Sequence, residues 1–184
     1  MKPDISPRQL RQLIRNGKWT TPTSGAASGY LQANLVMLPA AAAFNFLLFC
    51  VRNPKPCPIL DVLEPGRVEP IIAPGADLCT DLPRYKIFEK GEFKTEVEDV
   101  SDYFNENMVS FLLGCSFSFE NAMLAAGLPI RNMEEGKNVS MYTTDQRCAP
   151  AGPFSAPLVV TMRPMTPQQA IRAVQVTTRF HITN

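Results

Sequence analysis

The sequence predicts an α/β fold with a mixed-sheet core and a smaller hairpin-rich subdomain. Strand-like and helical patterns alternate in the second half of the chain, and hairpin-like patterns interrupt its middle. The composition is that of a globular protein, with 45% hydrophobic and 19% charged residues. Because 184 residues suffice for one core, we expect a single domain over residues 1–184, with the hairpin-rich insertion at about 64–108.

The first half of the chain contains one long apolar run, residues 35–51. This run is at the short limit for a membrane span, and Pro39 and Asn45 interrupt it, so it is better explained as a buried helix. The elements expected in this half are, in chain order, a helix from Ser6-Pro7 to Gly17, a Gly/Ser/Thr-rich loop at 21–34, a helix from Pro39 to just before Asn53-Pro54, and a strand at 59–63.

The second half alternates between β and helical patterns. The elements expected there are a hairpin at 84–97 that turns at Lys90-Gly91, a buried strand at 108–114, a helix at 117–126 ended by Gly127, a second hairpin at 131–144, a buried strand at 156–162, a helix that begins at Thr166-Pro167, and a strand over 174–178.

Charge and cysteine usage exclude several function classes. The net charge of +1 gives no electrostatic reason to expect nucleic acid or an anionic membrane as a partner. The five cysteines are odd in number and widely spaced, and the only histidine is His181, so we expect reduced thiols and no zinc site. The 21–34 loop lacks the lysine of a phosphate-binding loop, so no ATP is implied and no cofactor is evident.

The segment "LLGCSFSFE" is the strongest candidate for catalysis, because it places Cys115, Ser116 and Glu120 where a buried strand gives way to a helix. Ligands bind open α/β sheets at such strand ends, and the free amides of a helix start favour an anion and a low thiol pKa. The alternative is that Ser116 caps the helix, Cys115 is buried and Glu120 is solvated.

Other polar residues follow or interrupt apolar segments and are candidates for binding. Asp81 is a candidate base and Arg84 a candidate carboxylate clamp, although the two could instead form a structural ion pair. Arg163 follows an apolar strand, and we expect its guanidinium to lie within one small-ligand length of Cys115 or Ser116. The remaining candidates for substrate binding are Gln32, Asn34 and Thr143.

Seven segments together resemble the D-glutamate cyclase family, which includes the N-terminal region of a mitochondrial enzyme. They cover most of the chain from about Leu13 to Phe180, and they are "GYLQANLVMLP", "FCVRNPKPCPILDV", "DLPRYKIFEKGE", "LLGCSFSFE", "NVSMYTT", "PLVVTMRPM" and "QVTTRF". The resemblance implies an α/β fold in two subdomains and a hydro-lyase reaction in which D-glutamate closes to 5-oxo-D-proline with loss of water. It assigns no catalytic residues.

The resemblance leaves two other functions open, namely a related lyase or hydrolase acting on another small amino or keto acid, and a truncated chain that binds a ligand without catalysis. Family members usually continue beyond "TTRF", so we expect that residues beyond 184 would cover apolar surface that this chain exposes. The expected partner is a small amino acid, and a homo-oligomer is possible. The expected location is intracellular, in the mitochondrial matrix by resemblance or in the cytoplasm if the N-terminus is native.

Overall fold

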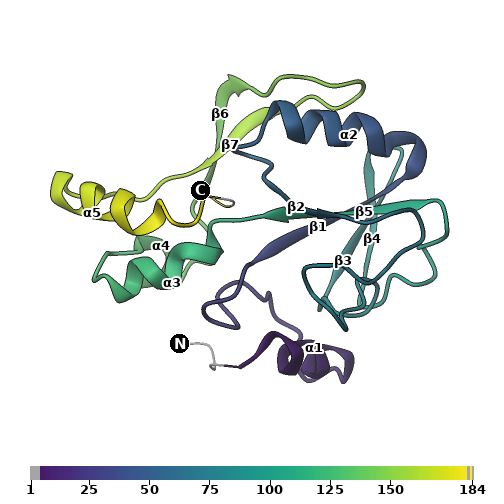
Figure 1. The fold of residues 1–184 in the computed structure, drawn as a ribbon, viewed down its shortest axis with the longest axis horizontal. Helices are drawn as coiled ribbons and strands as arrows, with labels where there is room; N and C mark the ends of the chain where they lie inside the picture. The colour runs from purple at the N-terminus through teal and green to yellow at the C-terminus, as the bar shows by residue number, and fades with distance from the viewer. Residues whose placement is uncertain (1–4, 182, 184) are drawn as a thin grey trace.

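A three-stranded antiparallel sheet forms the centre of the protein in the computed structural model, which describes residues 5–181 and 183 (Figure 1). The elements, in chain order, are α1 (Pro7–Arg15), β1 (Ala33–Pro39), α2 (Ala40–Arg52), β2 (Ile59–Val62), β3 (Tyr85–Glu89), β4 (Glu92–Val97), β5 (Met108–Gly114), α3 (Phe117–Ala125), α4 (Arg131–Glu134), β6 (Met141–Arg147), β7 (Pro157–Thr161) and α5 (Pro167–Thr177). The α/β class is confirmed, but every strand pair among the described residues is antiparallel, so the sheets are not mixed.

Strand β5 lies between β1 and β2 and is the most buried strand, as its unbroken apolar sequence predicts. Helix α2 covers one face of the sheet (Figure 1). Its Phe46 contacts Phe111 of β5 edge to face, with ring centroids 4.9 Å apart, and also contacts Phe154 at 5.2 Å. The long apolar run therefore forms both β1 and α2, since Pro39 ends the strand and caps the helix.

The opposite face of the sheet packs against the segment that contains the β3–β4 hairpin. Lys90 and Gly91 form its turn with positive φ angles of 52° and 85°, as the sequence predicts. Two apolar clusters join the segment to the sheet, and both include Leu35 and Met37 of β1. The first cluster is built on Leu63, Leu78 and Leu112, and the second on Cys79, Tyr85 and Val100. The boundaries of an insertion at 64–108 stay a prediction.

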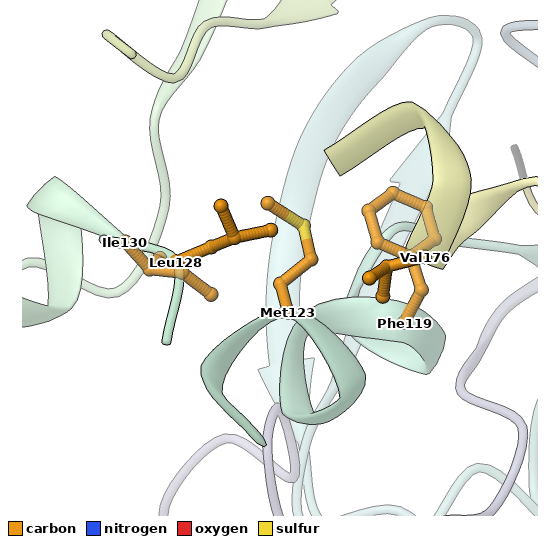
Figure 2. Packing of buried hydrophobic residues seen from close by; sticks show 5 residues of the cluster. All are labelled: Phe119, Met123, Leu128, Ile130 and Val176. Atoms are coloured by element: carbon orange, nitrogen blue, oxygen red, sulfur yellow. The ribbon is translucent and has the colours of Figure 1, made fainter. Parts of the chain in front are cut away.

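Helices α3, α4 and α5 lie together at one end of the sheet (Figure 1). Figure 2 shows Phe119 and Met123 of α3 beside Val176 of α5 and Leu128, and Ile130 completes the cluster. All five of these side chains are at most 6% exposed. This packing fixes α3, whose first turn contributes polar side chains to the cleft described below.

Three predicted elements differ from the structure. The hairpin at 131–144 is wrong, because 131–134 form α4 and the Asn132 side chain hydrogen-bonds to the carbonyl oxygens of Lys137 and Asn138. The strand at 174–178 is wrong as well. Residues up to Thr177 continue α5, and Val176 is buried against α3. Strand β7 is present, but its last three residues are exposed, since its partner is β6 and not the central sheet.

Helix α5 exposes apolar side chains, as expected for this end of the chain. Ile171 and Val174 are 63% and 65% exposed. That residues beyond 184 would cover these side chains stays a prediction.

Replacing Ser110 with alanine is expected to leave the protein as stable or stabilise it by about 1 kcal/mol. Ser110 is fully buried in the middle of β5, and its hydroxyl oxygen has no hydrogen-bond partner among the described residues. An unpaired buried hydroxyl costs free energy that alanine does not incur. Thermal melts of the two proteins test this, and a melting temperature that falls by several degrees in the variant would contradict it.

Candidate functional site

The start of α3 is fixed by hydrogen bonds to the segment that precedes β1. The backbone amide of Gln32 donates to the Ser118 hydroxyl at 2.9 Å, and the Cys115 amide donates to the Gln32 carbonyl at 3.3 Å. The Gln32 side chain also donates to the Ala26 carbonyl at 3.0 Å. The role of the 21–34 loop is thus partly structural, because its end holds the first turn of α3 in place.

Ser116 occupies the N-cap position of α3 but does not cap the helix with its side chain. Its backbone is already helical, with φ −63° and ψ −18°, a geometry unlike that of a hydroxyl-capped residue. The interpretation of Ser116 as a helix cap is therefore wrong. Its hydroxyl instead accepts a hydrogen bond from the Arg163 guanidinium at 3.2 Å.

Arg163 joins Ser116 and Glu120 in one buried cluster. Its Nη2 atom forms a salt bridge with Glu120 Oε1, and the two side chains are only 12% and 5% exposed. The guanidinium also lies 5.6 Å from the centre of the Phe119 ring, in a cation–π contact. The structure confirms that Arg163 lies near Ser116. The alternative in which the Glu120 side chain is exposed to solvent is wrong.

The buried salt bridge is only partly satisfied. Among the described residues, Glu120 Oε2 and Arg163 Nε are buried and have no hydrogen-bond partner. Such groups are rare in folded proteins and costly to leave unpaired, by about 1–3 kcal/mol each. Glu120 and Arg163 therefore carry one unsatisfied acceptor and one unsatisfied donor beside the cleft, both closed to solvent in this structure.

A cleft of about 1160 Å³ opens at the cluster. It lies between the start of α3, the 20–35 segment, the β6–β7 hairpin and the start of the β3–β4 hairpin. The predicted site residues that line it are Gln32, Asn34, Arg84, Cys115, Ser116 and Glu120. Six candidates thus share one cleft, with Arg163 in contact with two of them.

Asp81 is not among the residues that line the cleft, and its position argues against its predicted role as a base. Its carboxylate is buried beneath α1, where it accepts hydrogen bonds from Arg15 Nη2 at 2.8 Å and from the Asp77 amide at 2.7 Å. Arg11 lies 3.5 Å away. The hydrogen bond with Asp81 raises the pKa of Arg15. Asp81 therefore attaches α1 to the 75–81 segment.

The suggested Asp81–Arg84 ion pair is also wrong, because Arg84 pairs with Glu96 at 3.3 Å and lies 3.9 Å from Glu98. The Arg84 side chain is half-exposed and remains accessible from the cleft. Thr143 is exposed on β6 and is not among the residues that line the cleft. Its predicted contact with substrate gains no support from this placement.

All five cysteines are free thiols, as their number and spacing predict. The expectation that the helix start lowers the pKa of Cys115 is wrong. Burial raises this pKa, a hydrogen bond from the Phe117 amide partly offsets the rise, and the nearby charge of Glu120 adds to it. Cys115 is therefore a poor nucleophile at neutral pH, because little of it is thiolate.

The protein is expected to lose stability at alkaline pH. Burial raises the pKa of Cys50 to about 12 and that of Cys79 to about 11, from a usual value of 9.0. Because the folded state favours the protonated thiols, their stabilisation is complete below pH 9 and is lost as the pH rises toward 11–12.

Melting temperatures measured at pH 8, 9, 10 and 11 with a reductant present should fall with increasing steepness. A variant with alanine at Cys50 and Cys79 should show a shallower fall. Equal slopes for the two proteins would show that these thiols do not control alkaline stability.

The part of the chain described by the structure contains no group of three or more His, Cys, Asp or Glu side chains that could hold a metal ion. No helix within residues 5–181 is long and apolar enough to cross a membrane.

Comparisons with known proteins identify similar sequences. The family model described as "D-glutamate cyclase" matches residues 109–184. A protein of Syntrophobacter fumaroxidans named "Putative hydro-lyase" is 57% identical over 178 residues, which are 96% of this chain and 68% of the relative. Relatives with the same name from Stutzerimonas stutzeri and Rubrobacter xylanophilus are 55% and 53% identical; the alignments cover 96% and 94% of this chain, and 67% of each relative. These relatives are bacterial, so the mitochondrial expectation gains no support from them.

Proposed function

Because the chain belongs to the D-glutamate cyclase family, we propose that the cleft at the start of α3 is the active site of a hydro-lyase that closes D-glutamate to 5-oxo-D-proline. The observation that carries the proposal is the buried Glu120–Arg163 pair, which has an unpaired carboxylate oxygen and an unpaired Nε in the described chain. Buried polar groups of this kind, beside a cleft, are typical of binding and catalytic sites.

The reaction needs a group that moves protons. In the overall conversion the ammonium group loses two protons and the γ-carboxyl group loses one oxygen, and these leave together as water. A new C–N bond closes the ring. Glu120 is the best candidate for this transfer, because its carboxylate lines the cleft and its Oε2 has no hydrogen-bond partner among the described residues, so it could accept a proton from the amine and return it to the departing oxygen.

The substrate has two carboxylates, which need cationic or hydrogen-bonding partners. Arg163 holds Glu120 in place through Nη2 and has a free Nε. Ser116 is hydrogen-bonded to the same guanidinium and lines the cleft. Arg84 and Lys86 also line the cleft and are candidate partners for the second carboxylate.

Detection of 5-oxoproline by NMR, after incubation of the purified chain with D-glutamate, tests the proposal. L-Glutamate and heat-inactivated protein are the controls for stereochemistry and for spontaneous cyclisation. Product from D-glutamate alone supports the assignment. Loss of water from another small amino or hydroxy acid, without cyclisation of glutamate, would keep the hydro-lyase class and reject the substrate. No reaction with any of these substrates would contradict the proposal.

A further inference from the structure

Three of the five cysteines are brought together beside the cleft. Cys50 is in the last turn of α2, Cys57 is in the loop before β2, and Cys148 directly follows β6. Cys57 and Cys148 line the cleft and are half-buried, whereas Cys50 is only 1% exposed. None of the three belongs to the candidate active-site residues described above.

Asn53 fixes the three segments that carry these thiols. Its backbone amide donates to the Cys50 carbonyl at 3.1 Å, and its own carbonyl accepts from the Cys57 amide at 3.1 Å. Its side chain forms two hydrogen bonds of 2.8 Å with the backbone of Ala149, the residue after Cys148. Because Asn53 is itself buried, we expect the three cysteines to keep this arrangement.

The Cys50 and Cys57 thiols are hydrogen-bonded to each other. Burial raises the pKa of Cys50 to about 12, and the neighbouring Cys57 adds to the rise. Burial also raises the pKa of Cys57, the nearby Cys148 adds to the rise, and the hydrogen bond from Cys50 lowers it. The hydrogen bond therefore favours ionisation of Cys57 over that of Cys50.

We propose that Cys50 and Cys57 are a redox pair that a peroxide converts to a disulfide, and that this change in the cleft wall lowers activity. The oxidant can reach Cys57 through the cleft, whereas the buried Cys50 is placed to act as the resolving thiol. Formation of the disulfide does not depend on the proposed function. Its effect on activity does rest on that function.

The oxidation is balanced with hydrogen peroxide as the oxidant. The Cys57 thiolate sulfur forms a bond to one peroxide oxygen, the O–O bond breaks, and the other oxygen takes up a proton and leaves as water. The Cys50 sulfur then attacks the sulfenic acid of Cys57. The S–S bond forms, the S–O bond breaks, and the oxygen leaves as a second water with the Cys50 proton. The two sulfurs lose two electrons in total, and the peroxide gains them.

The bridge would disturb the start of α3 through Pro58. The carbonyl of Pro58, the residue after Cys57, accepts from the Gly114 amide at 2.8 Å. Gly114 ends β5 and lies two residues before Ser116. A covalent bond between two sulfurs is much shorter than a hydrogen bond between them, so closing it would pull the 57–58 segment toward α2 and displace Gly114.

Peptide mapping of the wild-type protein tests the pair. Complete tryptic digestion places Cys50 in peptide 19–52 and Cys57 in peptide 53–67. After treatment with hydrogen peroxide and blocking of the remaining thiols with iodoacetamide, mass spectrometry should find these two peptides joined, and dithiothreitol should separate them. Peptides that stay separate, or peptide 53–67 joined instead to the one that contains Cys148, would overturn the assignment.

Three serine variants separate the roles of the thiols. Cys57→Ser should form no bridge. Cys50→Ser lacks the resolving thiol, so its Cys57 should remain as a sulfenic acid that dimedone traps. Cys148→Ser is the matched control and should still form the bridge. Loss of the bridge in a folded Cys148→Ser variant would show that the third thiol takes part and that the pair is wrongly assigned.

The activity of the oxidised protein tests the effect on the cleft. The rate of 5-oxoproline formation should fall by about tenfold or more, since a displacement of about 1 Å in a site can cost about 10²-fold, and dithiothreitol should restore it. Cys57→Ser should keep its own rate after the same treatment. A bridged protein with the full rate would overturn the effect on activity and leave the proposed function intact. A reduced protein without cyclase activity would reject the proposed function, while the peptide map still decides whether the pair forms.

Discussion

Replacing Glu120 with glutamine is expected to lower the rate of 5-oxoproline formation by about 10²- to 10⁴-fold, the usual contribution of a general acid–base group. Glutamine nearly preserves the shape of the side chain and can still accept a hydrogen bond from Arg163, but it cannot take up a proton from the amine. The rate of product formation from D-glutamate at saturating concentration is the measurement. Ser116 and Cys115 would remain in the variant, so retained activity would assign the proton transfer to another group.

Two controls distinguish this catalytic effect from unfolding. Glu134→Gln changes an exposed carboxylate on α4 and should leave the rate unchanged. Circular dichroism should show a folded Glu120→Gln variant that melts lower, because the buried Arg163 then lacks its counter-charge. An activity loss that only matches the unfolded fraction would show that Glu120 has a structural role and no catalytic one.

Replacing Asp81 with alanine is expected to destabilise the protein by roughly 2–3 kcal/mol, because it removes charge-assisted hydrogen bonds to a buried carboxylate, whereas its partner Arg15 is 41% exposed and can be solvated. The change removes the acceptor for Arg15 and for the Asp77 amide, and it detaches α1 from the 75–81 segment. Chemical denaturation of the variant measures the effect. The exposed Asp102 is the matched control, and its alanine variant should stay within about 0.5 kcal/mol of the wild type.

The same variant also tests the predicted catalytic role of Asp81. Below its melting temperature, Asp81→Ala should form 5-oxoproline at the wild-type rate per folded molecule, because Asp81 is not among the residues that line the cleft. A variant that is fully folded and inactive would restore Asp81 as a candidate base.

Local patterns were sufficient to predict most elements of the fold. Ser6 and Thr166 each begin a helix with a capping box that pairs them with Gln9 and Gln169, and Pro follows each cap. Short alternations were misleading. Val174 and Val176 alternate as in a strand, but no breaker precedes them, so the helix continues to Thr177 and buries Val176 against α3.

The candidate site was predictable where its residues are close together in the sequence. The segment from Gly114 to Glu120 is short enough that its position at a strand–helix junction follows from sequence, and Arg163 follows the next apolar strand. Asp81 was an equally good candidate in the sequence, because no residue near it reveals a structural partner. Its partners Arg11 and Arg15 are about 70 residues away in the chain, and their contact depends on tertiary packing.

A crystal structure of the protein soaked with 5-oxo-D-proline tests the central claim most directly. We predict the lactam ring in the cleft at the start of α3, with its carbonyl oxygen or a carboxylate oxygen within hydrogen-bonding distance, about 3 Å, of Arg163 Nε. Glu120 Oε2 should face the lactam nitrogen. A ligand bound elsewhere, with Glu120 and Arg163 making no contact to it, would contradict the assignment of this cleft as the active site.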